Sequence, residues 1–177
     1  LADGDGGLLL VTNAAGDNDH DFFQLVKEGY KYEAGKQLAF NMRFKTSDAT
    51  QSDIVAGLQL TDTSPLDVTD GIFFLKSDGA TTISFIVEKD STQSTLTLPN
   101  SLADDTFMTI GFVYDPKDQK FHVFQNNVLA GTVVSTNAPD DEELTLSFGI
   151  QNGAAAAKTL TVDYIGASKE RTAATEL

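Results

Sequence analysis

The stretch "QLAFNMRFK", from Gln37 to Lys45, alternates apolar with small or polar side chains. In an extended chain, successive side chains point to opposite faces, so Leu38, Phe40, Met42 and Phe44 share one face. A strand with this pattern buries one face and leaves the other wetter. The stretch therefore predicts a β-strand that packs one face against a core.

Three further segments repeat the period-two pattern: "TTISFIVEK" (81–89), "TFMTIGFVYD" (106–115) and "KFHVFQ" (120–125). The second is apolar on both faces, which favours a central strand in a sheet that is covered on both sides. No window has convincing helical periodicity, although "SLADDTF" (101–107) has room for one short turn.

Turn signals separate these segments. "YDPKDQK" (114–120), "QNNV" (125–128) and "KSDGATT" (76–82) indicate hairpins, because Pro, Asn and Asp-Gly favour tight turns. "TNAPDDEE" (136–143) and "TDTSPLDVTDG" (61–71) indicate polar surface loops. Frequent short strands and turns predict an all-β fold, a two-sheet antiparallel β-sandwich with little or no helix.

Two long strands are expected near the C-terminus. "ELTLSFGI" (143–150) and "AKTLTVDYIGAS" (157–168) indicate two long strands near the end of an antiparallel sheet. We expect Asp163 to face solvent or lie at an edge rather than bind a metal. The sequence predicts a single β-sandwich domain over residues 1–171 and a polar C-terminal tail over 172–177.

The composition excludes several classes of binding partner and of chemistry. The net charge of −14 repels nucleic-acid phosphates, and the absence of Cys excludes disulfides and thiolate chemistry. No apolar run has the length of a membrane span and no signal-peptide pattern occurs, so we expect no membrane partner. Because the chain begins with Leu1 rather than Met, we expect that residues ahead of it were removed.

The sequence predicts no catalytic residue and no cofactor. The two histidines, His20 and His122, lie far apart, and no nucleophile elbow or phosphate loop occurs. Glycoside hydrolysis needs two carboxyl groups facing each other across a sugar. Glu142 and Glu143 lie in a loop, Glu88 is isolated at a strand end, and Trp is absent. We therefore expect a protein that is not an enzyme.

One acidic loop resembles a cation-binding loop. "GDNDHD" offers Asp17, Asn18, Asp19 and Asp21 as oxygen ligands, but it has neither the glycine nor the distal Glu of an EF-hand. We interpret it, and the acidic loop at 61–71, as hydrophilic surface. No metal site is predicted.

The segment "TFMTIGFVYDPKDQKFHVFQNNVLAGTV" (106–133) resembles the paired strands of concanavalin A-like and laminin G-like domains. The shared features are a strand that ends in Tyr114-Asp115, a turn, a strand with alternating apolar residues, and an Asn-rich turn at Asn126-Asn127. This resemblance implies a jelly-roll sandwich.

Nearly the whole chain resembles a family of tailed-bacteriophage virion proteins, through "SDATQSD" (47–53), "TDGIFF" (69–74) and "FGIQNG" with "KTLTVDYI" (148–165). Members lie among head genes and are described as structural, decoration or capsid-cement proteins. The resemblance implies a non-enzymatic protein of the virion that binds the outer capsid surface and stabilises the head. The expected partners are the major capsid protein and further copies of this chain, in a homo-oligomer.

A carbohydrate-binding jelly-roll module for host-surface attachment is the alternative. The fold permits it, and the four tyrosines offer rings that stack on sugars: Tyr30, Tyr32, Tyr114 and Tyr164.

Overall fold

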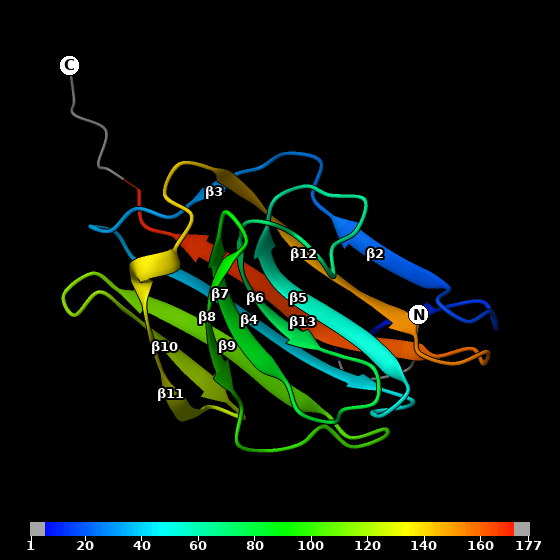
Figure 1. Cartoon of the computed structure of the whole chain (residues 1–177). Helices are drawn as coiled ribbons and strands as arrows, with labels where there is room; N and C mark the ends of the chain where they lie inside the picture. The colour runs from blue at the N-terminus through cyan, green and yellow to red at the C-terminus, as the bar shows by residue number, and fades with distance from the viewer. Residues whose placement is uncertain (1–5, 172–177) are drawn as a thin grey trace.

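The structure, a computed structural model, describes residues 6–171, so the expected tail at 172–177 lies outside the described residues. Two antiparallel sheets pack face to face (Figure 1). The predicted fold class, an antiparallel two-sheet β-sandwich, is confirmed. The described residues contain no α-helix, and their one helical turn is the 3₁₀ helix η1 (Ser135–Asn137).

Sheet I is the six-stranded sheet. Its strands, in spatial order, are β1 (Leu9–Thr12), β13 (Thr159–Lys169), β4 (Leu38–Thr46), β9 (Met108–Asp115), β10 (Lys120–Gln125) and β11 (Val128–Val134). The strands β1 and β11 form its edges.

Sheet II is the seven-stranded sheet. Its strands, in spatial order, are β2 (His20–Gln24), β12 (Glu143–Asn152), β5 (Ser52–Gln59), β6 (Gly71–Lys76), β7 (Ser84–Lys89) and β8 (Thr92–Thr97), and the short strand β3 (Tyr30–Lys31) also pairs with β12.

Phenylalanines fill the space between the sheets. The apolar face predicted for β4 is buried, from Leu38 to Phe44. The ring of Phe112 contacts Phe40, Phe85 and Phe121, with ring centroids 5.3–6.0 Å apart. Each such buried side chain contributes about 1.5–3 kcal/mol through removal of apolar area from water. The core therefore holds both sheets in one rigid unit.

The three predicted hairpins are present. The β9–β10 hairpin closes with a hydrogen bond from the Gln119 N–H to the Asp115 carbonyl, at 3.0 Å. The β10–β11 turn places Asn126 and Asn127 at φ 51° and 64°, the left-handed region that Asn tolerates. The β6–β7 turn has Gly79 at φ 76°. Local turn chemistry therefore accounts for these connections.

The expectation that both C-terminal strands lie near the end of one antiparallel sheet was wrong. β12 lies in sheet II and β13 lies in sheet I, so the Ala-rich connection at 153–158 crosses from one sheet to the other. Each strand instead lies beside an edge strand, β2 and β1 respectively. Chain order fails to give spatial neighbours here because a jelly roll alternates between its two sheets.

The outer faces of the two sheets differ. On sheet II, the loop between β5 and β6 places Leu66 and Val68 over Val55, Phe73 and Ile86, which form a second, smaller hydrophobic cluster. On sheet I, β9 is central as expected, but the prediction that both of its faces are covered was wrong, because Val113 is 36% exposed. The outer face of sheet I is therefore more open than that of sheet II.

No helix of the described residues is long and apolar enough to cross a membrane.

Candidate functional site

A shallow groove runs across the outer face of sheet I. Three adjoining depressions share Val113 or Asn41 in their lining, and one of them has a volume of about 330 Å³. We call this feature the sheet I groove and define it by its outward-facing residues, which are Ala39, Asn41, Gly111, Val113, Phe124, Gly166 and Ser168.

Strand register explains why the groove is hollow. Asn41 lies between Gly166 of β13 and Gly111 of β9, and Ala39 pairs with Ser168. These small side chains stand where larger ones would project from the sheet. A side chain at Gly166 would meet only the Asn41 Oδ1 at 3.5 Å, which is ordinary van der Waals contact, whereas one at Gly111 would lie 2.8 Å from the Phe40 carbonyl oxygen. The floor at Gly166 is therefore open space above the sheet.

Aromatic and polar side chains border the groove. Phe124 of β10 and Asn127 of the following turn line one depression. Tyr164, which is 41% exposed, pairs in register with Arg43 and lies two residues along β13 from Gly166. The groove thus combines flat apolar rings with amide groups, which suits a ligand that has both an apolar face and hydroxyl groups.

A charged cluster fixes one border of the groove. The Arg43 guanidinium donates to the Asp163 carboxylate at 2.5 Å and lies over the Phe107 ring, 4.1 Å from its centroid. The ion pair is partly exposed, with 38% and 24% of the two side chains accessible. We predicted from the sequence that Asp163 faces solvent or lies at an edge, and we did not predict its ion pair with Arg43. A register shift between Val162 and Tyr164 leaves Asp163 outside the regular pairing, within reach of Arg43.

Of the four tyrosines that the sequence offered for sugar stacking, two are unsuitable. Tyr32 and Tyr114 are buried, and the Tyr32 hydroxyl donates to the Tyr114 hydroxyl at 3.0 Å. Burial raises the pKa of Tyr32 to about 12. Tyr30 is half-buried, and Tyr164 alone of the four is exposed. The groove's other residues were not identified from sequence, because small residues in a strand carry no local signal of a hollow.

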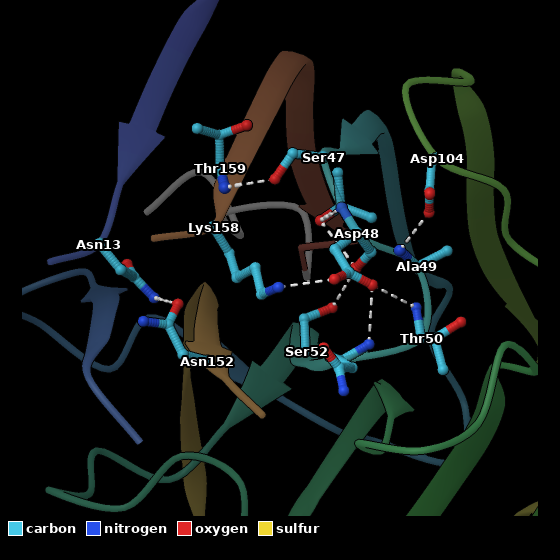
Figure 2. Close-up of polar contacts among 12 residues, drawn as sticks. Asn13, Ser47, Asp48, Ala49, Thr50, Ser52, Asp104, Asn152, Lys158 and Thr159 are labelled. Carbon is cyan, nitrogen blue, oxygen red and sulfur yellow. Dashed lines mark hydrogen bonds and ion pairs between the residues drawn. The ribbon is translucent and has the colours of Figure 1, made fainter. Parts of the chain in front are cut away.

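A dense polar cluster lies away from the groove, where the turn after β4 meets the start of β13 (Figure 2). Asp48 accepts hydrogen bonds from the N–H groups of Thr50 and Gln51, at 3.0 and 2.8 Å, and from Lys158 Nζ at 2.6 Å. The Gln51 bond first, and then Lys158, lower the pKa of Asp48 to about 2. Both carboxylate oxygens are occupied by the chain itself, so we assign the cluster a structural role.

Lys76 occupies an adjoining oxygen pocket. Its ammonium donates to the carbonyl of Thr50 at 2.9 Å and to the carbonyl of Ser52, while the side chain is fully buried. Burial lowers the pKa of Lys76. The ammonium links β6 to the turn before β5 through hydrogen bonds to main-chain oxygens. We therefore assign Lys76 a structural role.

In the acidic loop at Asp17–Asp21, Asp19 caps its own turn, since its Oδ2 accepts from the Gly16 N–H at 2.8 Å. Among residues 6–171, His, Asp and Glu ligand atoms come together in groups of three or more at one place only, which involves His122 rather than this loop. His20 pairs with Gln151 near one end of β12, whereas Glu143 pairs with Lys31 at the other end, so the two residues lie apart.

Solved structures share this fold. The carbohydrate recognition domain of Emp46p, in its metal-free form, matches with a TM-score of 0.64 and 12% identity over 90% of this chain and 87% of that chain. A mixed-linkage-glucan GH16 protein of Bacteroides ovatus matches with a TM-score of 0.62 and 13% identity, over 94% and 83%. A protein of unknown function from Shewanella oneidensis MR-1 matches with a TM-score of 0.63 and 18% identity, over 100% and 75%.

No family model and no curated protein matches the sequence. The structural matches establish that the chain is a concanavalin A-like jelly-roll β-sandwich, as the hairpin at 106–133 implied. At these identities the likeness concerns the fold alone.

Proposed function

We propose that this chain is a non-enzymatic carbohydrate-binding module and that the sheet I groove is its binding face. The observation that carries this proposal is the open groove with a floor of small residues, lined by the ring of Phe124 and the amide of Asn41. The exposed ring of Tyr164 lies two residues along β13 from the floor at Gly166. An open, elongated groove suits a polymer chain, whereas small molecules are usually enclosed.

The structural matches support this proposal by analogy. One match is a carbohydrate recognition domain and another was solved with a glucan product, so sandwiches of this shape bind sugars in other proteins. The same fold also carries hydrolases, which need two facing carboxyl groups. Among the described residues that line the three depressions, Glu170 is the one carboxylate, which favours binding without cleavage.

A glycan array tests the proposal, with the wild-type chain compared against Gly166→Ile. The isoleucine side chain fills the groove from its floor, and Gly166 has room for a Cβ, so we expect an intact fold and lost binding. Tyr164→Ala should weaken binding by about fivefold, because one exposed stacking ring contributes on the order of 1 kcal/mol.

The matched control is Phe23→Ala. Phe23 is 43% exposed, close to the 41% of Tyr164, but it lies on β2 of sheet II. Binding that survives Gly166→Ile, or that falls equally in Phe23→Ala, would contradict the sheet I groove as the binding face. Incubation of any bound glucan with the protein should release no reducing ends; release would overturn the non-enzymatic part.

A second candidate function is decoration of a virion capsid, with the major capsid protein and further copies of the chain as partners. It rests on the sequence resemblance to bacteriophage virion proteins and on one structural observation. Edge strands of both sheets carry exposed apolar side chains, which suit repeated contacts with neighbours: Leu9, Leu10, Phe23, Val128, Leu129 and Val134.

Co-sedimentation with purified capsids that lack the protein tests this candidate. Saturable binding at a fixed ratio to capsid subunits would support a place on the capsid surface. Loss of that binding at high salt would indicate docking through the acidic surface, and persistence would indicate the apolar edges. If the chain binds no capsid at any salt concentration, the decoration role is ruled out and only the carbohydrate-binding proposal remains.

A further inference from the structure

The β9–β10 hairpin brings two carboxylates and an imidazole together. One ligand atom each from Asp115, Asp118 and His122 lie within 4.8 Å of one another, and residues 6–171 contain no second group of this kind. In the sequence, His122 lies far from the other histidine, His20, and no ligand partner was predicted for it. The hairpin turn supplies one, because it folds Asp118 back onto the strand that carries His122.

Register places the side chains of Asp115 and His122 on the outer side of sheet I, and Asp118 lies in the turn between their strands. Asp115 pairs with Lys120, and Val113 pairs with His122, so Asp115 and His122 project from the same face near the turn. His122 Nε2 lies 3.0 Å from Asp118 Oδ2. The site therefore borders the sheet I groove at Val113 but consists of different residues.

The hairpin backbone orients both carboxylates. Asp115 Oδ1 accepts from the Lys117 N–H at 2.9 Å, and Asp118 Oδ1 accepts from the Lys120 N–H at 3.2 Å. The second oxygen of Asp118 points to His122, and the second oxygen of Asp115 has no hydrogen bond within the described residues. Asp115 thus keeps one oxygen for a further ligand, whereas the second oxygen of Asp118 contacts His122, a contact that a metal ion bound by both groups would replace.

Among the described residues, the two carboxylates of this hairpin have no Lys or Arg partner, although Lys117 and Lys120 lie in the same hairpin. Asp140 and Asp141 pair with Lys89, and Asp163 pairs with Arg43. Within residues 6–171, neither Asp115 nor Asp118 forms an ion pair with Lys or Arg. Two carboxylates held close together repel each other, and a bound dication would offset that repulsion.

We propose that Asp115, Asp118 and His122 form a binding site for a divalent first-row transition metal such as Zn²⁺. Zinc takes imidazole nitrogen at about 2.0–2.1 Å and carboxylate oxygen at about 2.0–2.2 Å, so neighbouring ligand atoms of a tetrahedral ion are about 3.4 Å apart. Three atoms within 4.8 Å of one another reach that arrangement through small side-chain rotations. The exposed setting leaves at least one coordination position for water or another ligand.

The ligand set discriminates between metals. Ca²⁺ takes six to eight oxygen ligands, and this hairpin offers two carboxylates and a nitrogen. Imidazole nitrogen favours Zn²⁺ and its neighbours in the first transition row. The site is independent of the carbohydrate-binding proposal, since it is tested with metal alone.

Isothermal titration calorimetry of chelator-treated protein with Zn²⁺ tests the site. We expect saturable binding of one ion per chain. His122→Ala and Asp118→Asn should each weaken binding by more than about tenfold, since even outer partners of metal ligands change affinity 10- to 100-fold. Ca²⁺ in tenfold excess should not displace Zn²⁺.

The chain offers a matched control, because it has two histidines. His20 is exposed beside the acidic Asp17–Asp21 loop, and His20→Ala should leave Zn²⁺ binding unchanged. Absence of saturable Zn²⁺ binding by the wild-type chain, or equal loss in His20→Ala and His122→Ala, would overturn the proposal. Co²⁺ absorption in the visible range gives a second readout: its coordination-dependent bands should disappear in His122→Ala while circular dichroism shows an unchanged fold.

Discussion

Asp48 and Lys158 form an ion pair that is largely withdrawn from water, with 26% and 7% of their side chains exposed. Asp48→Asn keeps an oxygen that accepts from the Thr50 and Gln51 N–H groups but leaves the Lys158 ammonium without its counter-ion. Breaking a buried pair costs about 3–5 kcal/mol, and partial exposure of Asp48 reduces this. We expect a loss of about 2–3 kcal/mol in the free energy of unfolding, measured by urea denaturation.

The control for this substitution is Asp141→Asn. Asp141 pairs with Lys89 at 3.0 Å, but 59% of its side chain is exposed and Lys89 keeps Asp140 as a partner. An exposed pair of this kind contributes less than about 1 kcal/mol. Equal losses in the two variants would show that burial does not set the strength of the Asp48–Lys158 pair.

Glu88 is a buried carboxylate near Asp70 and Asp67, and burial is the main cause that raises its pKa. A raised pKa means that the ionised form is less favourable in the folded chain than in the unfolded chain. The penalty is absent below the unfolded pKa, grows as the pH rises from the unfolded pKa to the folded pKa, and is fully present above the folded pKa. Glu88→Gln removes this charge and keeps an oxygen for the Gln93 side-chain amide, which lies 3.1 Å from Glu88 Oε1.

We therefore expect Glu88→Gln to have a higher free energy of unfolding than the wild-type chain at pH 7 and an equal one at pH 3. Urea denaturation at both pH values measures this difference. A variant that is less stable than the wild-type chain at pH 7 would mean that the Glu88 carboxylate is stabilised by its surroundings rather than desolvated by them.

At the level of elements, the β10–β11 turn depends on two residues in the left-handed region. Asn126, at φ 51°, also accepts from the Thr109 N–H through its Oδ1, at 2.9 Å. Asn126→Ala loses that bond and places an ordinary residue at positive φ, so we expect a loss of about 1.5–3 kcal/mol in the free energy of unfolding. Asn127→Gly keeps positive φ at no steric cost and should change stability by less than about 0.5 kcal/mol.

Urea denaturation of both turn variants measures these effects, and the contrast between them is the informative result. Two variants of equal stability would show that the turn conformation is imposed by the flanking strands. In that case the left-handed preference of Asn would not be what specifies this hairpin.

This turn also shows which structural features could be predicted from the sequence. The conformation of Asn126 and Asn127 is a local property, and so is the alternation of Leu38, Phe40 and Met42; both were predicted correctly. The assignment of β12 and β13 to different sheets is not local, because a period-two pattern identifies a buried face without saying which sheet it belongs to.

The candidate sites could not be predicted from the sequence for a related reason. Gly166, Asn41 and Gly111 come from three strands, and only the register of sheet I sets them in one row as the floor of a groove. Burial of Tyr32 and Tyr114 likewise depends on packing between sheets, so composition overstated the aromatic surface. Asp118 and His122 meet through a turn whose existence was predicted but whose side-chain directions were not.

At the level of the whole molecule, the strong negative charge opposes self-association, whereas the apolar edge strands favour it. The net charge of −14 makes copies repel one another at neutral pH. Edge strands meanwhile expose Phe23 at 43% and Leu129 at 53%, and Leu25, just beyond β2, is 51% exposed. Repulsion between exposed charges is screened within about 10 Å at 0.1 M salt, whereas apolar contacts are not weakened by salt.

Salt at pH 7 should therefore promote self-association through the edges. In sedimentation velocity, we expect the weight-average sedimentation coefficient to rise between ~20 mM and ~500 mM NaCl, as the screening length falls several-fold. The double variant Phe23→Ser and Leu25→Ser keeps the net charge and removes the apolar edge of β2 but not those of β1 and β11, so its coefficient should rise less than that of the wild-type chain. Tyr164→Ser, with similar exposure on the sheet I face, should associate like the wild-type chain. A wild-type chain that stays monomeric at every salt concentration would argue against edge-driven association and would remove the structural support for a capsid-decorating role.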